Sequence, residues 1–237
     1  MSNGILMLAF GQQYDRFAAH TCAYSRRHTD IPITVISNLK KRDNKWESVP
    51  NIDFNYFDLP QEQNRQIKTT LINYTPYEKT LYLDCDAIIQ RPGIEKIFDL
   101  IIPDRLLLNI YGRWSNPLRA PALYQRAFLR AGISLPINIY YGAIFGFTKT
   151  QKIGDFFTLY NKYWQENGSG REMPALACAV YNSRVAVKEI NRRSGWFSWP
   201  KDGAAIIQHE YGRHVRRLVG CLDFKAYKPF DRRGAAA

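Results

Sequence analysis

Two carboxylates one residue apart are the clearest candidates for chemistry in this 237-residue chain. Asp84 and Asp86 interrupt an apolar stretch, residues 80–89, that is typical of a buried strand. Residues i and i+2 of a strand point to the same face, so we expect the two side chains to project side by side from the strand's end. Paired carboxylates are costly to bury unless a cation lies between them, and a divalent metal with oxygen ligands is the simplest such cation.

An Asp-x-Asp pair after a strand is also typical of a plain solvated turn, and this alternative stays open at the sequence level. Two observations favour a metal site. The apolar residues 87–89 follow the pair at once, which embeds the carboxylates in the fold. Ligand sites in open α/β sheets also lie at the carboxyl ends of strands.

The segments around this pair alternate between strand and helix. We expect strands at residues 4–10, 33–37, 54–58, around 81, 106–111, 137–147 and 204–208, and helices at 12–28, 64–71, 94–100, 152–165 and 173–181. This alternation predicts an α/β fold, a three-layer α/β/α sandwich with a mostly parallel central sheet.

Composition allows a sizeable core and argues against disorder, because 46% of the residues are hydrophobic and 14% are aromatic. The four cysteines are far apart and form no zinc-type spacing, which indicates reduced, buried thiols in a cytosolic protein. The apolar segment 4–10 lacks the flanks of a signal peptide, and no apolar run reaches membrane-spanning length. We therefore expect a cytoplasmic location.

The net charge of +12 is concentrated towards the C-terminus. Residues 191–237 hold ten Lys and Arg against four Asp and Glu, which gives +6. Such a basic surface indicates a polyanionic partner, either nucleic acid or an anionic lipid headgroup layer. The alternative is a basic protein with an ordinary solvated face.

Residues 74–86 resemble the stretch before and through the Asp-x-Asp motif of nucleotide-sugar glycosyltransferases with the GT-A (Rossmann-like) fold. The chain is most similar to the glycogenin and lipopolysaccharide galactosyltransferase group and to related small phage-type enzymes. The resemblance runs roughly from residue 4 to residue 217, and the Asp-x-Asp segment is its one specific motif. It implies a single GT-A domain over residues 1–217 and a basic C-terminal extension at 218–237.

The family's metal is also held by a histidine in a His-x-x-Gly context, which His209 matches. The resemblance therefore implies that Asp84, Asp86 and His209 hold Mn²⁺ or Mg²⁺, a mixed oxygen and imidazole set. The metal would bridge the diphosphate of a UDP-sugar, which Asp84 would help to bind. A structural histidine is the alternative for His209. The family's diphosphate-binding lysine is replaced here by Val215, and Arg213 or Arg216 could substitute for it.

The resemblance also places the nucleotide on the first strand and helix. Ala9, Phe10 and Gly11 would run along the base and ribose, and Tyr14 would stack on the uracil. Lys68 occupies the position of a basic residue that this group directs towards the nucleotide. The alternatives are ordinary core or surface aromatics for Phe10 and Tyr14, and a solvent-exposed lysine for Lys68.

Two further segments would line the donor sugar. Residues 140–144 replace the family's Asn-x-Gly-Val segment and keep Gly142 but not the asparagine. Glu172 matches the family's acidic element and would bind donor-sugar hydroxyls or lie near the reacting carbon, which makes Glu172 and Asp86 the candidate catalytic residues. Alternatively, Glu172 only caps the helix that we expect to start at Pro174.

These features predict a hexosyltransferase that uses a UDP-sugar, with retention of configuration implied by the resemblance alone. The favoured acceptor is nucleic acid, a hydroxymethylated base in phage-type DNA, which would be modified in the host cytoplasm. The candidate acceptor-binding residues are aromatic or basic: Trp196, Trp199, Arg192, Arg193, Arg216 and Arg217. The two tryptophans could equally form a satellite hydrophobic cluster.

Two other interpretations of the function stay open. In the first, the acceptor is a bacterial cell-envelope glycolipid, and residues 214–230 form an interfacial amphipathic segment on anionic lipid. In the second, the protein is a non-catalytic nucleic-acid-binding protein that keeps the fold for its basic surface. The presence of Asp84, Asp86 and His209 together argues against the second.

Overall fold

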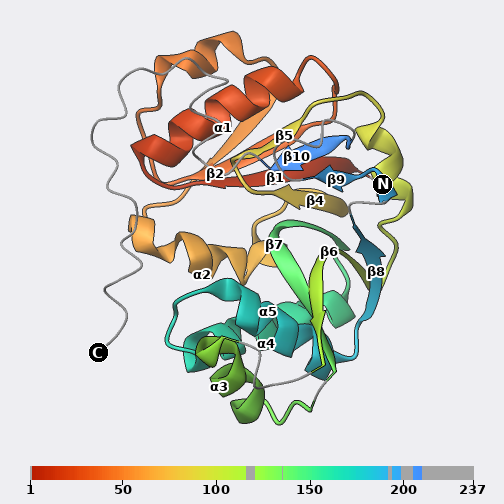
Figure 1. The fold of residues 1–237 in the computed structure, drawn as a ribbon. Helices are drawn as coiled ribbons and strands as arrows, with labels where there is room; N and C mark the ends of the chain where they lie inside the picture. The colour runs from red at the N-terminus through yellow and green to blue at the C-terminus, as the bar shows by residue number, and fades with distance from the viewer. Residues whose placement is uncertain (1, 116–120, 135, 192–193, 199–204, 210–237) are drawn as a thin grey trace.

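The computed structural model describes residues 2–115, 121–134, 136–191, 194–198 and 205–209. Its centre is a seven-stranded sheet with the order β3-β2-β1-β4-β7-β6-β8 (Figure 1). Strand β7 pairs antiparallel with both neighbours, and the other pairs are parallel. The strands are β1 (Asn3–Ala9), β2 (Ile33–Ser37), β3 (Ile52–Tyr56), β4 (Lys79–Leu83), β6 (Arg105–Trp114), β7 (Ile137–Thr148) and β8 (Ala186–Ile190).

Apolar residues cover both faces of this sheet, because successive side chains of a strand point to opposite faces. In β1, Ile5 and Met7 join one core, and Leu6 and Leu8 join the other. The first core packs against α1 (Gln12–Ser25) and the 3₁₀ helix η4 (Ile94–Asp99). The second packs against α2 (Asn64–Lys68), α3 (Ala122–Arg130), α4 (Gln151–Glu166) and α5 (Glu172–Ser183).

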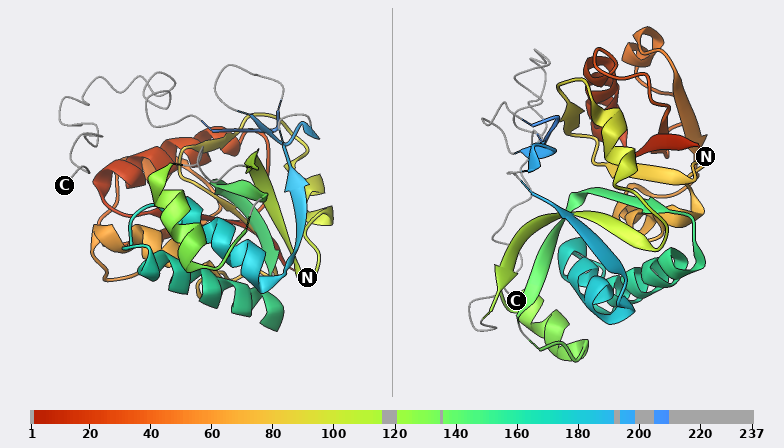
Figure 2. Two further views of the ribbon diagram at one scale, coloured as in Figure 1. Left: turned by 60° about the horizontal axis from the view of Figure 1, so that its bottom comes forward. Right: turned by 90° about the vertical axis from the view of Figure 1, so that its right-hand side faces the viewer.

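The right-hand view of Figure 2 shows the resulting layers, with α1 (red) on one side of the sheet and α4 and α5 (teal to cyan) on the other. The predicted three-layer α/β/α fold with a mostly parallel sheet is therefore confirmed. Short 3₁₀ helices complete the connections: η1 (Asn44–Ser48), η2 (Gln61–Gln63) and η3 (Leu71–Asn73).

A second, three-stranded sheet places the last described strand beside a short strand from the middle of the sequence. Its order is β5 (Ala87–Ile89), β10 (Ile207–His209) and β9 (Phe197–Ser198). Strands β5 and β10 pair antiparallel, with His209 opposite Ala87. This pairing sets His209 beside the turn that carries the two aspartates.

The structure corrects the expected geometry of the aspartate pair. Strand β4 ends at Leu83, so Asp84 and Asp86 lie on a tight turn between β4 and β5 instead of within one strand. The backbone N–H of Ala87 donates to the carbonyl of Asp84 at 2.8 Å, which closes this turn. The carboxylates come together because the turn folds back, not because they share a strand face.

Several predicted boundaries also differ. Helix α1 ends at Ser25, three residues before the predicted end, and the expected helix 64–71 is α-helical only as far as Lys68. The sequence pattern did not predict α3, β8 or β9. Among the described residues, no helix is both long and apolar enough to cross a membrane.

The cysteine prediction is confirmed where it can be checked. Cys22, Cys85 and Cys178 are free, buried thiols, and Cys221 lies outside the described residues. The predicted domain boundary between residues 217 and 218 also lies outside them, so it stays a prediction.

Candidate metal and nucleotide-sugar site

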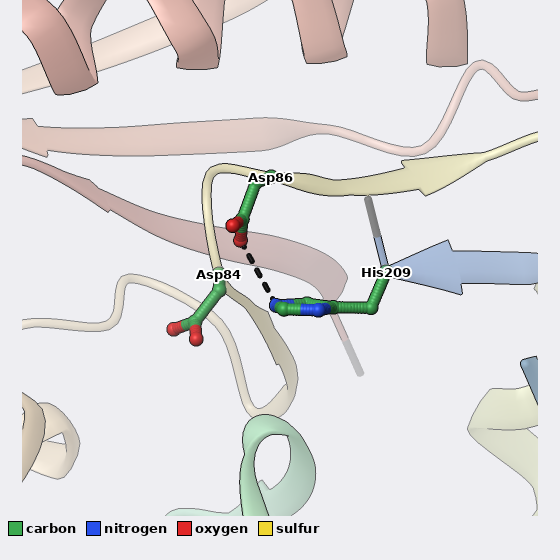
Figure 3. Close-up of side chains that lie close together, drawn as sticks. All are labelled: Asp84, Asp86 and His209. Carbon is green, nitrogen blue, oxygen red and sulfur yellow. Dashed lines mark ion pairs between the residues drawn. The ribbon is translucent and has the colours of Figure 1, made fainter. Parts of the chain in front are cut away.

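The two aspartates and His209 form one cluster at the carboxyl edge of the central sheet. One ligand atom from each of Asp84, Asp86 and His209 lies within 4.8 Å of the others. His209 Nε2 is 3.0 Å from Asp86 Oδ1, and Figure 3 shows the imidazole of β10 facing the turn from which both carboxylates project. Two oxygens and an imidazole nitrogen at this spacing can converge on one cation at about 2.0–2.6 Å after small side-chain rotations. The donor set therefore fits a divalent metal such as Mn²⁺.

Three hydrogen bonds to the backbone of residues 84–87 hold the turn in place. The N–H of Asp84 donates to the carbonyl of Ala143 in β7 at 2.8 Å, and the hydroxyl of Thr21 in α1 donates to the carbonyl of Cys85 at 2.6 Å. The third is the Ala87–Asp84 bond that closes the turn. Burial raises the pKa of the Cys85 thiol well above its usual value, so the side chain between the aspartates stays neutral.

Asp86 stays ionised at neutral pH even though it is largely surrounded by protein. Burial raises the pKa of a carboxyl, but the charge and hydrogen bond of His209, a backbone hydrogen bond and the charge of Lys68 together outweigh this effect, and the pKa of Asp86 is lowered. His209 itself is 3% exposed. Its ring meets the ring of Tyr141 edge-on at 5.4 Å between centroids, which fixes its orientation towards Asp86.

Lys68 links Asp84 to Glu172. Its ammonium group donates to Asp84 Oδ1 at 2.7 Å and to Glu172 Oε1 at 3.3 Å, and its side chain is only 6% exposed. Burial lowers the pKa of a lysine, but the two carboxylates outweigh it, so the pKa of Lys68 is raised and the side chain stays charged. These contacts contradict the solvent-exposed alternative for Lys68.

Two residues that the sequence did not single out complete this network. The Tyr82 hydroxyl donates to Asp84 Oδ1 at 2.6 Å, and Arg65 Nε lies 3.9 Å from Glu172 Oε2. Burial keeps the pKa of Tyr82 well above its usual value, so it remains a hydroxyl donor. Their spacing in the sequence is the signal that could have identified them. Tyr82 is two residues before Asp84, and Arg65 is three residues before Lys68 on a helix.

Glu172 is the first residue of α5, so this helix starts two residues before Pro174. Burial raises the pKa of Glu172, but Lys68, a backbone N–H and Arg65 outweigh it and lower the pKa. Gly142 lies directly against the pair: a Cβ there would be 3.4 Å from Glu172 Oε1 and 3.6 Å from Lys68 Nζ. The structure thus brings Glu172, Lys68 and Gly142 together with Asp84.

The predicted nucleotide segment lies at the same edge of the sheet, after β1. Gly11 has φ +83°, a backbone conformation that favours glycine, and a Cβ on it would also displace the Gln61 side chain, whose Oε1 would lie 2.3 Å away. Its N–H donates to Asn38 Oδ1 at 2.7 Å, which ties the end of β1 to the end of β2.

The side chains of Ala9 and Phe10 are fully buried, and Phe10 belongs to the core on the α4 and α5 face. Only their backbone could therefore lie along a nucleotide. Tyr14 is half-buried, with its ring edge-on to Phe17 at 6.3 Å. Nucleotide contacts by Ala9, Phe10, Gly11 and Tyr14 stay predictions.

Most of the predicted acceptor-binding residues lie outside the described part of the chain, as does one residue predicted to contact the diphosphate. These are Trp199, Arg192, Arg193, Arg216, Arg217 and Arg213. Trp196 is described, is half-buried and packs against the apolar core that also contains α1. This packing agrees with the satellite-cluster alternative, and its acceptor role stays a prediction.

No protein-family model matches this sequence, and no curated protein matches it. Among solved structures, the chain is similar to a crystal structure of the galactosyltransferase LgtC in complex with donor and acceptor sugar analogues. The match covers 98% of this chain and 99% of that chain, with a TM-score of 0.58 and 15% sequence identity. The likeness shows the fold and confirms the GT-A architecture that the Asp84–Asp86 segment predicted.

Proposed function

We propose that this protein is a divalent-metal-dependent glycosyltransferase that moves a sugar from a nucleotide diphosphate sugar to an acceptor hydroxyl. The observation that carries the proposal is the convergence of Asp84, Asp86 and His209 at the carboxyl edge of a GT-A sheet. Neither feature alone identifies a transferase. Together they combine a site for a hard cation with the edge of the sheet where α/β proteins bind nucleotides.

In this proposal, Asp84, Asp86 and His209 hold the metal, and the ionised Asp86 supplies negative charge for it. When bound, the metal neutralises the diphosphate leaving group. Tyr82 and Lys68 both bond to Asp84 Oδ1 and so fix its carboxylate plane. We expect Mn²⁺ or Mg²⁺ and a UDP-sugar, and we expect Tyr14 to stack on the base.

Glu172 is the proposed residue for the donor sugar. Lys68 and Arg65 keep it ionised and hold its position, so it can accept hydrogen bonds from sugar hydroxyls. Because Gly142 carries no Cβ, a sugar ring could approach this carboxylate closely. Retention of configuration is the stereochemical outcome that we propose for this site.

For the acceptor, we now favour a carbohydrate, such as the sugar of a cell-envelope glycolipid, over the nucleic acid that the net charge suggested. The structurally similar protein LgtC was crystallised with an acceptor sugar analogue. The case for nucleic acid rests on the net charge of +12 and on the basic residues of the C-terminal part of the sequence.

The test is UDP release from a panel of UDP-sugars in the presence of Mn²⁺. The acceptors are soluble glycans, detergent-solubilised lipooligosaccharide and hydroxymethylated DNA. The site variant is Asp86→Asn. The matched control is Asp99→Asn, because Asp99 is an exposed aspartate on η4, near the amino end of β4. We expect Mn²⁺-dependent release that is lost in Asp86→Asn and kept in Asp99→Asn. Equal activity in chelator, or in Asp86→Asn, would exclude the mechanism.

Binding to nucleic acid without catalysis is the second candidate, and the net charge of +12 favours it. It predicts a gel shift with duplex DNA that weakens steeply with salt. It also predicts no thermal shift with Mn²⁺ and UDP. Liposome flotation with anionic lipid, run in parallel, separates this candidate from binding to a membrane surface.

A further inference from the structure

Two tyrosine rings extend from the candidate metal site towards solvent. The ring of Tyr141 lies 5.4 Å from that of His209, edge-on. The ring of Tyr111 stacks on that of Tyr141, with 6.2 Å between the centroids and an angle of 21° between the ring planes. Tyr111 is 55% exposed. The rings therefore form a stack beside a proposed metal ligand, and Tyr111 is the member of the stack that presents its ring to solvent.

An irregularity in the pairing of β6 with β7 accounts for the exposed position of Tyr111. Ile110 of β6 pairs with Tyr140 of β7, and Gly112 pairs with Ile139, so Tyr111 is an extra residue without a partner in the register. This is the pattern of a β-bulge, which turns a side chain away from the direction that strict alternation would give it. Bulges of this kind are over-represented next to active sites.

The position of the tyrosines in the sheet separates them from the nucleotide segment. Gly11 and Asn38 follow β1 and β2, on one side of β4, whereas Tyr111 and Tyr141 belong to β6 and β7, on its other side. The aspartate turn follows β4 and so lies between the two. If a nucleotide lies over β1 and β2, the tyrosines face the opposite side of the metal, where an acceptor must approach.

We propose that the exposed ring of Tyr111, held in place by stacking on Tyr141, forms the platform on which the acceptor sugar ring lies; this inference rests on the proposed function. A hexose presents an apolar face of C–H groups, which packs on an aromatic ring, while its hydroxyls reach polar groups at the edge. The tyrosine hydroxyls supply such groups.

The charges of the Asp84–Lys68–Glu172 network favour a sugar over a nucleobase. A nucleic acid strand would bring phosphates, which need cations close by. Within the described residues, the two cations of the site network are already paired, Lys68 with Asp84 and Glu172, and Arg65 with Glu172. Carboxylates repel phosphates but accept hydrogen bonds from sugar hydroxyls, so an uncharged, hydroxyl-rich ring fits better.

The test is saturation-transfer NMR on the full chain loaded with Mg²⁺ and UDP. The probes are lactose, maltose, cellobiose, methyl β-D-galactopyranoside and a thymidine octanucleotide. We expect saturation of the ring C–H protons of at least one glycoside in the wild-type protein. Tyr111→Ala should raise the apparent Kd of that glycoside about tenfold. Tyr111→Phe should keep most of the binding, because it keeps the ring.

The matched control is Tyr181→Ala. Tyr181 is 44% exposed and lies on α5, nine residues beyond Glu172, or about 13 Å further along the helix. The Tyr181→Ala variant should bind the glycoside as the wild-type protein does. The platform is overturned if Tyr111→Ala and Tyr181→Ala bind the glycoside equally, if no glycoside binds to the loaded wild-type protein, or if only the octanucleotide contact depends on Tyr111. Failure of the wild-type protein to bind UDP would instead refute the proposed function.

Discussion

Aspartates serve two different purposes at the carboxyl edge of this sheet. Asp15, in the first turn of α1, is 1% exposed, and its two oxygens accept from Trp46 Nε1 and the backbone N–H of Asp43, both at 3.0 Å. Asp84 and Asp86 retain 28% and 20% side-chain exposure. Neutral donors occupy both oxygens of Asp15, whereas the aspartate pair faces an ammonium group and an imidazole.

This difference separates a structural carboxylate from a site for chemistry. Asp15 ties α1 to the segment around η1 through hydrogen bonds to both of its oxygens, and at 1% exposure it is closed off from solvent. Both hydrogen bonds to the Asp84 side chain fall on Oδ1, so within the described part of the chain Oδ2 remains available to a cation. Burial alone therefore does not identify the functional aspartates, but the nature of their partners does.

Asp86→Ala should have the largest effect on the functional side of this comparison. Loss of one metal ligand removes several kcal/mol of charge stabilisation, so we expect transfer to fall by about a thousandfold, or about 4 kcal/mol. The measurement is the rate of UDP release, with circular dichroism as the check on folding. A fully active, folded Asp86→Ala variant would place this aspartate with Asp15 as a structural residue.

Lys68→Met should destabilise the protein by about 3 kcal/mol, because it leaves Asp84 and Glu172 close together and partly buried without their shared cation. Urea denaturation in the absence of metal measures the free energy of unfolding. Lys68→Arg keeps the charge and should lose much less. If Lys68→Met is as stable as wild type, the Asp84–Lys68–Glu172 network is not stabilising.

Asp15→Asn should cost about 2 kcal/mol in the free energy of unfolding, since an amide can accept from only one of the two N–H donors through its oxygen. Calorimetric titration of the folded variant should show UDP binding in Mn²⁺ within about twofold of wild type. A specific loss of UDP binding in a variant that remains folded would remove the distinction between the two sets of aspartates.

The pH dependence should show the smallest effect. The pKa of Glu172 is lowered from its ordinary 4.5, so its contribution is complete above that pH and is lost as the pH falls through the lower, folded value. We expect the free energy of unfolding to fall as the pH is lowered below 4.5, because the unfolded carboxyl takes up its proton before the folded one does. Glu172→Gln should flatten that part of the stability curve. If the acid side of the stability curve is the same in Glu172→Gln and in wild type, Lys68 does not hold Glu172 in its charged form.

The sequence predicted the parallel half of the sheet well. Strands β1, β2 and β4 are short, largely apolar runs, and this is the pattern of buried strands. The spacing of Asp84 and Asp86 also identified the aspartate pair, whereas His209 was identified only through a resemblance, since nothing in the sequence shows that residues 123 positions apart pair through β5 and β10. Only the tertiary register brings them together.

The antiparallel half was harder to predict. The bulge at Tyr111 breaks the alternation from which strand faces are inferred, so its exposed ring could not be distinguished from a core aromatic. Lys68 is a similar case: a lysine on a short helix is usually solvated, and only the fold places two carboxylates beside it.

The most direct test of the central claim is calorimetric titration of UDP into the protein with Mn²⁺ or with EDTA, in wild type and in His209→Ala. His209 comes from a strand far along the chain, so it tests the whole cluster and not only the aspartate turn. The account predicts UDP binding in Mn²⁺ that is lost in EDTA and is at least tenfold weaker in His209→Ala, because even the loss of a residue that only supports a metal ligand typically costs about 10–100-fold in metal affinity. Equal UDP binding with Mn²⁺ and with EDTA, or no binding in either, would contradict it.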